Sequence, residues 1–162
     1  LHAIRSVQKT IRRLQGRVPY GQGMTLSPFH LAFPVSDIEE ARRFFGDLLG
    51  CKEGRSATRW VDFDFFGHQI SAHLRETDKL NDATNAVDGD NVPVRHFGLI
   101  LKWDDWEQLA EKLTSKGATF LIKPKIRFAG KPGEQGTMFV KGPSGNTLEF
   151  KTFRDFKDIF AQ

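Results

Sequence analysis

The stretch PFHLAFPVSD, residues 28–37, opens a pattern that returns in the second half of the chain as VRHFGLILK, residues 94–102. In both stretches bulky apolar residues alternate with smaller or polar ones, which is typical of a β-strand with one buried face. His30 and His96 hold equivalent positions near the two starts, opposite the apolar rows. The two stretches therefore predict an internal repeat, each copy of which begins with the same kind of strand.

Elements that follow these strands extend the repeat over most of the chain. An N-cap candidate at Asp37 precedes an amphipathic helix that should end at Gly50, and a hairpin should follow around Gly67-His68. The second half repeats this order and closes with a hairpin that turns at 143–146. Each half therefore reads as βαβββ, an α+β arrangement. We expect one domain over 24–162, with module one at 28–76, an exposed link at 77–93, module two at 94–153 and a short helical tail at 154–162.

Composition excludes several classes of protein. The chain has 162 residues, of which 15 are Phe and 39% are apolar, and this suits one globular domain. No apolar run is long enough to span a bilayer, so we expect no membrane partner. The single cysteine, Cys51, predicts a reducing compartment, and we expect the protein in the cytoplasm.

The net charge of +4 comes from the first 23 residues, which hold five basic and no acidic side chains. The rest of the chain has 19 basic and 20 acidic side chains, and this predicts no nucleic-acid partner. Apolar residues within 1–23 follow a helical spacing. An organellar transit peptide fits this basic amphipathic pattern, and so do an appended helix and upstream sequence added for expression. Import into an organelle thus stays an alternative to the cytoplasm.

Two histidines and one carboxylate carry the candidate chemistry. His30 and His96 are each followed two residues later by a small residue, Ala32 or Gly98, which predicts open space beside each imidazole. Glu149 lies on the last strand, on the face opposite its apolar neighbours. If these faces converge, the three side chains form a divalent-metal site with positions left open for water or substrate, suited to Fe(II), Mn(II), Ni(II) or Zn(II). Considered alone, each residue also has a purely structural alternative. Each histidine is then a strand residue with its hydrogen bonds made within the fold, and Glu149 is a side chain exposed to solvent.

Further residues have roles that the sequence leaves open. The sequence leaves three roles open for His73: a fourth metal ligand, an acid/base group or a surface residue. Of these, we take the acid/base role as the candidate. Trp60 is a candidate for the wall of the substrate site, although strand aromatics are more often core. Arg127 belongs to a predicted loop at 124–136 together with Lys125 and Lys131. These cations either steer an anionic substrate or form a solvated loop.

Four segments of the chain resemble those of a known family. The segments PFHLAFPVSD (28–37), FFGDLLGC (44–51), RHFG (95–98) and GPSGNTLEF (142–150) are similar to the vicinal oxygen chelate superfamily. That superfamily groups glyoxalase I, fosfomycin-resistance thiol transferases, bleomycin-resistance proteins and extradiol dioxygenases. The resemblance covers 28–153. It implies two βαβββ modules that form a cup-shaped curved mixed sheet with the helices outside, commonly as a homodimer.

By the same resemblance, His30, His96 and Glu149 are the metal ligands and the substrate is a small molecule with neighbouring oxygens. Glyoxalase I takes a further ligand from the first module, and the equivalent position here holds Ser71, a poor ligand that we assign to the substrate site. The chain therefore departs from a four-ligand glyoxalase I and is more similar to the three-ligand dioxygenases and transferases. The alternative function is a metal-free binding protein of the bleomycin-resistance type.

Overall fold

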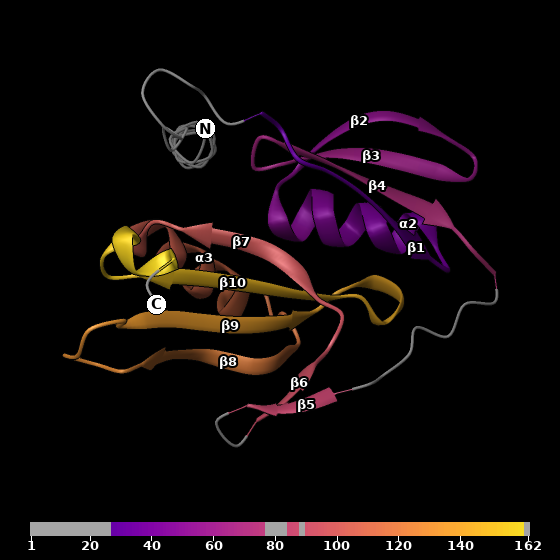
Figure 1. Cartoon of the computed structure of the whole chain (residues 1–162). Helices are drawn as coiled ribbons and strands as arrows, with labels where there is room; N and C mark the ends of the chain where they lie inside the picture. Colours follow the sequence, from indigo (N-terminus) through magenta and orange to yellow (C-terminus); the bar gives the residue numbers. More distant parts are fainter. Residues whose placement is uncertain (1–26, 77–83, 88–89, 161–162) are drawn as a thin grey trace. The chain divides into compact units, whose positions relative to one another are not determined.

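The computed structural model describes residues 27–76, 84–87 and 90–160, and the chain divides into two compact units after Glu76. The segment 1–23, interpreted above as a leader or an appended helix, lies outside the described residues. Within the part of the chain that is described, no helix has the length and apolar character needed to cross a bilayer. Each unit is built around its own four-stranded mixed sheet (Figure 1).

The sheet of the first unit has the order β1-β4-β3-β2. Its strands are β1 (His30–Val35), β2 (Lys52–Ala57), β3 (Trp60–Phe65) and β4 (His68–Leu74), with β1 parallel to β4 and the other pairs antiparallel. One face packs on the helical segment formed by α2 (Ile38–Ala41) and η1 (Arg42–Leu49). Phe45 is fully buried there, with its ring 5.2 Å from that of Phe63 and 5.5 Å from that of Phe33. The opposite face of the sheet is left for polar side chains.

The α-helical spacing of the segment 38–49 predicts a buried face of Ile38, Ala41, Phe44, Phe45 and Leu48, whereas the structure buries Ile38, Ala41, Phe45 and Leu49. The second part of this segment is a π-helix, at whose end the Gly50 amide donates to the carbonyls of Gly46 and Phe45 and the Cys51 amide also donates to the carbonyl of Phe45. Because this turn is wider than an α-turn, Phe45 and Leu49 point inward while Leu48, which the α-helical spacing predicts to be buried, is half-buried. Gly50 ends the helix in the left-handed conformation with φ of 82°, as predicted.

The second unit repeats the architecture with the order β7-β10-β9-β8. β10 is parallel to β7 and antiparallel to β9, and the helix α3 (Trp103–Ser115) packs on one face of the sheet. Both units are therefore βαβββ, which confirms the predicted fold class. The other elements are β7 (Phe97–Leu101), β8 (Phe120–Arg127), β9 (Gln135–Lys141), η2 (Pro143–Gly145), β10 (Thr147–Phe153) and η3 (Phe156–Phe160).

Equivalent hairpin turns support the alignment of the two copies. Phe66 and Ser144 both have positive φ, 55° and 56°, and each is followed by a glycine, Gly67 or Gly145, with φ of 91° or 76°. Two successive residues of this conformation make the tight turn that suits the twist of a β-hairpin. Because Ser71 and Glu149 each lie four residues after these glycines, they occupy equivalent positions in the two units.

The segment that we predicted to be an exposed link contains a short hairpin. β5 (Thr84–Val87) pairs with β6 (Asp90–Pro93), and Val92 is buried against Ile122 and Phe139 of the second unit. The sequence of this segment is rich in polar and turn-forming residues, and a single apolar residue such as Val92 gives too weak a signal to predict a strand. The hairpin adds an apolar wall to the sheet face that carries Phe139.

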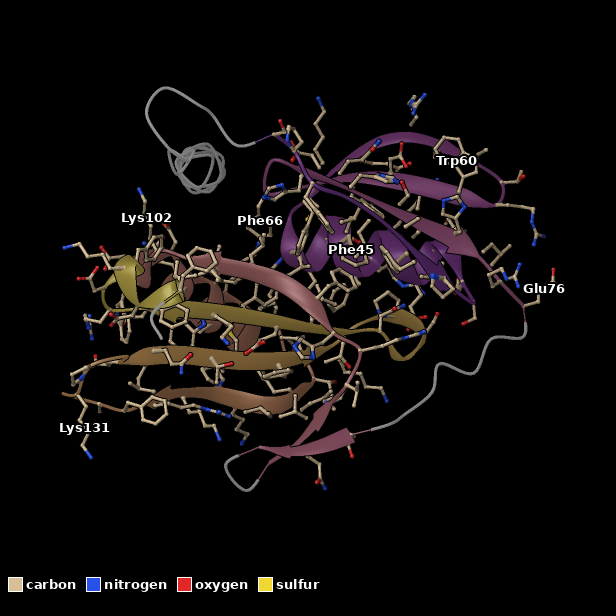
Figure 2. The ribbon with its side chains drawn as sticks, in the orientation of Figure 1. Phe45, Trp60, Phe66, Glu76, Lys102 and Lys131 are labelled. Carbon is tan, nitrogen blue, oxygen red and sulfur yellow. The ribbon has the colours of Figure 1, made fainter. Side chains whose placement is uncertain are left out.

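Strand β8 continues into the predicted loop at 124–136. The prediction was wrong for residues 124–127, because β8 is an edge strand that tolerates Pro124, and the pairing with β9 shifts register between Ile122 and Lys125. The loop itself connects β8 to β9 and carries Lys131, which is exposed (Figure 2).

Hydrogen bonds of Glu134 connect the loop between β8 and β9 to Arg154, the residue that follows β10. Glu134 accepts hydrogen bonds from the Gly130 amide at 2.5 Å and from Arg154 at 2.9 Å. The Gly130 amide and the Arg154 guanidinium lower the pKa of Glu134.

The short helix η3 follows β10. The spacing of apolar residues in the tail predicts Phe160 on the apolar side of this helix, but Phe160 is 86% exposed.

Candidate metal centre

Two of the three predicted ligands meet in the second unit. His96 lies just before β7 and Glu149 lies on β10, next to β7 in the sheet. The strands approach closely here, because Gly98 pairs with Glu149 and a Cβ at Gly98 would lie 1.6 Å from the Glu149 carbonyl oxygen. Gly98, which we expected to leave open space beside the imidazole, is exposed but has no room for a Cβ, because the Glu149 backbone occupies that position. The glycine instead permits the contact between the two strands.

The ring of His96 is oriented by its own backbone neighbour. Its Nδ1 lies 2.8 Å from the carbonyl oxygen of Pro93. A carbonyl oxygen only accepts hydrogen bonds, so this contact assigns a proton to Nδ1. In the neutral ring the lone pair is then on Nε2, which lies 3.3 Å from Oε2 of Glu149. The Phe139 ring packs edge to face against the imidazole, with 5.2 Å between the two ring centres.

This pair of facing atoms fits a metal ion. A neutral Nε2 and a carboxylate oxygen both accept, so a cation, either a proton or a metal ion, must lie between them. Two ligands at the usual ~2.0–2.2 Å from a divalent ion are about 3.0–3.5 Å apart, and the observed 3.3 Å lies in this interval. A histidine whose other nitrogen donates to a backbone carbonyl is the usual arrangement in metal sites.

Glu149 is oriented by two residues that the sequence did not identify. Its other oxygen, Oε1, accepts a hydrogen bond of 2.7 Å from the Thr137 hydroxyl and lies 3.8 Å from Nζ of Lys151. Residues of the sheet therefore hold one carboxylate oxygen of Glu149, and the other oxygen faces His96. Lys151 lies two residues after Glu149 on the same face of β10, whereas Thr137 can be recognised only from the register between β9 and β10.

Of the remaining predicted site residues, Arg127 ends β8 in the second unit, and the other four share one face of the sheet in the first unit. His30 pairs with Gln69, and two further rows place Ser71 and His73 on the same face of β4. Trp60 pairs with His73 and lies on the side of the sheet away from the helix (Figure 2). His30 and His73 are exposed, whereas Ser71 is buried.

A buried carboxylate that the sequence analysis missed lies beside Ser71. Asp62 on β3 is 6% exposed and accepts hydrogen bonds from the Ser71 hydroxyl at 2.5 Å and from the Gln69 amide at 3.2 Å. Arg55 lies 3.8 Å away. Asp62, Gln69 and Arg55, but not Ser71, line part of a pocket of about 390 Å³ on the first unit. Asp62 stands among aromatic and apolar residues of β3, and only the register reveals its partners.

The contact between Ser71 and Asp62 should have a measurable effect on stability. Replacing Ser71 with Ala removes a donor to a buried carboxylate, and we expect the free energy of unfolding to fall by about 1.5–3 kcal/mol. Urea denaturation measures this change. The exposed Ser27 provides a control, since Ser27→Ala should alter the free energy of unfolding by less than about 0.5 kcal/mol. Equal effects of the two substitutions would contradict the role given to Asp62.

Among the residues that the structure describes, no three His, Cys, Asp or Glu side chains are gathered closely enough to hold a metal ion. His96 and Glu149, two of the three predicted ligands, lie together in the second unit. His30 belongs to the first unit, and its share in the centre is a proposal.

The architecture and the His96–Glu149 pair can now be compared with known proteins. Residues 27–150 match the model of the Glyoxalase/Bleomycin resistance protein/Dioxygenase superfamily. The chain belongs to this superfamily. The match covers both βαβββ units and includes His30, His96 and Glu149, so the resemblance seen in the sequence is confirmed.

Solved structures of the superfamily agree with this assignment. A glyoxalase/bleomycin resistance protein/dioxygenase from Alicyclobacillus acidocaldarius is 31% identical, with a TM-score of 0.69, over 83% of this chain and 96% of that one. The genomically encoded fosfomycin resistance protein FosX from Listeria monocytogenes has a TM-score of 0.60 over 83% of this chain and 98% of its own. Its identity is 15%, so that similarity supports the fold alone. Members of the superfamily serve in metal-dependent or ligand-binding roles.

Proposed function

We propose that the protein is a divalent-metal-dependent enzyme acting on a small substrate with two neighbouring oxygens, and that His30, His96 and Glu149 hold the ion. The observation that carries the proposal is the pair of acceptors, His96 Nε2 and Glu149 Oε2, facing each other at 3.3 Å. Pro93 and Thr137 hold the outer atoms of these two residues, as expected of residues that orient metal ligands. Histidine and carboxylate donors suit Fe(II), Mn(II), Ni(II) and Zn(II) alike.

The first unit supports a three-ligand centre over a four-ligand one. The residue equivalent to Glu149 is Ser71, whose hydroxyl donates to Asp62 and is a weak metal ligand. A centre with three protein ligands leaves positions for both substrate oxygens, as in a dioxygenase-like or transferase-like enzyme. A metal ion bound there would act as a Lewis acid on the substrate oxygens.

Other residues receive roles from their position. We assign His73 as the acid/base group because it is exposed on the face of β4 that neighbours His30, where an imidazole can exchange protons with substrate or water. Ser71 and Trp60 lie on the same face and are proposed substrate contacts, as is Arg127 on β8. We further propose a homodimer, as is common in the superfamily.

One observation favours a second candidate, a metal-free binding protein. Oε1 of Glu149 is already contacted by Thr137 and Lys151, and a doubly protonated His96 would satisfy Oε2 without a metal ion. The pair would then be a structural ion pair, and the protein would bind its small molecule without catalysis.

Metal content distinguishes these two functions. Protein purified without chelator should contain roughly one equivalent of a divalent ion per chain, and His30→Ala should lose most of it because one of three ligands is gone. His68 is the matched control: it lies in the first unit, accepts a hydrogen bond from the Phe29 amide and has no assigned role in the centre, so His68→Ala should keep the ion. Mass spectrometry of the metals gives the measurement. Failure to bind Fe(II), Mn(II), Ni(II) or Zn(II) under any loading condition would establish the metal-free alternative.

A further inference from the structure

Resting on the proposed function, we propose that the hairpin of β5 and β6 keeps the His96–Glu149 pair open for a metal ion, with Val92 as its positioning residue. The hairpin holds the carbonyl oxygen of Pro93 beside Nδ1 of His96. This carbonyl denies His96 the tautomer with a proton on Nε2, which would donate to Glu149 and take the place of the ion. Val92 therefore acts on the ion through Pro93 and His96 rather than as a ligand.

The two tautomers of a neutral His96 have opposite consequences for metal binding. With the proton on Nδ1, the ring donates to the Pro93 carbonyl over 2.8 Å and directs the Nε2 lone pair at Oε2 of Glu149. With the proton on Nε2, the ring would donate to Oε2, 3.3 Å away, and Nε2 would have no lone pair for a cation. That tautomer would also place the Nδ1 lone pair against a carbonyl oxygen at 2.8 Å, which is repulsive. A fixed Pro93 carbonyl therefore selects the tautomer that binds metal.

Pro93 is held by its own strand and by its neighbour in the chain. It pairs with Thr84 in the register of β5 and β6. Val92, the residue before it, is 8% exposed and belongs to one buried cluster with Ile122 and Phe139. Because Pro93 follows Val92 directly and its ring fixes its φ, anchoring Val92 restricts where the Pro93 carbonyl can lie.

Phe139 connects the same cluster to the imidazole. Its ring packs edge to face on His96, and the residue pairs with Glu149 across β9 and β10. The cluster therefore supports both contacts that orient His96, the ring packing and the hydrogen bond to Pro93. A two-stranded hairpin is only marginally stable by itself, so the packing of Val92 is what keeps Pro93 in place. Its loss should free the imidazole while the four-stranded sheet remains.

NMR of the metal-free protein tests the tautomer directly. Two-bond ¹H–¹⁵N correlations of the ring, recorded at about pH 9 where histidine is ordinarily neutral, show which nitrogen has the proton. Comparison with His96→Gln assigns the signals. We expect the proton on Nδ1 in more than about 90% of unmodified molecules and in less than about half of Val92→Ala molecules, because the freed ring then donates to Glu149. Val92→Ile retains a branched apolar anchor and should restore the original tautomer.

Affinity for a divalent ion should follow the tautomer. Competition for Zn(II) against a chelating dye should show a loss of about 10–100-fold in Val92→Ala and of less than about threefold in Val92→Ile. Val140→Ala is the matched control, because it removes the same methyl groups from a fully buried valine of β9 outside this cluster, and it should leave tautomer and affinity unchanged. Thermal unfolding verifies that each variant is folded. Val92→Thr, which has the shape of valine, replaces Val92→Ala if that variant is not.

The outcomes separate the inference from the proposed function. A proton on Nε2 of His96 in the unmodified protein, an unchanged tautomer in Val92→Ala, or an equal change in Val140→Ala would overturn the inference. Unchanged zinc affinity despite an altered tautomer would overturn it as well. If the tautomer responds as expected but the unmodified protein binds no divalent ion, the proposed function fails, while the hairpin is still shown to orient His96.

Discussion

Replacing Glu149 with glutamine is expected to lower the affinity of the protein for divalent ions by more than about 100-fold. The amide has the shape of the carboxylate and can still accept the hydrogen bond from Thr137, so the sheet should be preserved. It lacks the negative charge, and the atom that faces Nε2 of His96 becomes a poor ligand. Competition against a chelating dye of known affinity measures the change.

A graded control separates the ligand from the residue that orients it. Thr137→Val removes the hydroxyl that holds Oε1 but leaves the carboxylate, and we expect a smaller loss of about 10–100-fold. Both variants should unfold within a few degrees of the unmodified protein. If Glu149→Gln binds the ion as tightly as the parent, Glu149 is no ligand and the His96–Glu149 pair is structural.

Adding one methyl group at Gly98 should be the most destabilising small change in the second unit. The Cβ of Gly98→Ala would lie 1.6 Å from the carbonyl oxygen of Glu149 and 2.6 Å from its carbonyl carbon. These are backbone atoms of a paired strand, so no rotation of a side chain relieves the overlap, and β7 must separate from β10. We expect the free energy of unfolding to fall by more than about 3 kcal/mol.

Gly46 offers the same substitution where space is available. A Cβ there meets nothing within 4 Å, and the residue lies inside the helical segment η1, so Gly46→Ala should be neutral or stabilising by up to about 1 kcal/mol. Chemical denaturation of both variants measures the difference. Similar stabilities would show that β7 and β10 are further apart than described.

Strong periodicity explains what the sequence predicted correctly. Alternation around His30 and around His96 predicted β1 and β7, and the predicted hairpin turn at 143–146 agrees with β10, which begins at Thr147. These strands have one apolar face against a helix, which imposes the period of two on their side chains. The repeat followed from them, and so did the placement of Glu149 on the polar face.

What escaped the sequence depends on contacts between strands. Asp62 and Thr137 are ordinary strand residues until the register places them against Ser71 and Glu149. At Gly98 the sequence showed a small residue, but whether it leaves room or admits another backbone depends on the neighbouring strand. The hairpin β5–β6 lacks a repeated apolar pattern, so its formation depends on tertiary packing of Val92.

The acidic residue on the polar sheet face lies on a different strand in each of the two copies of the repeat. In the second unit the acid, Glu149, is on β10 and faces a phenylalanine on β9; in the first the acid, Asp62, is on β3 and faces a serine on β4. Two substitutions, Ser71→Glu and Asp62→Phe, interconvert these arrangements without altering a backbone hydrogen bond. Duplicated halves of this kind can therefore diverge in coordination chemistry while their shared scaffold is conserved, and the donor count becomes an evolvable trait.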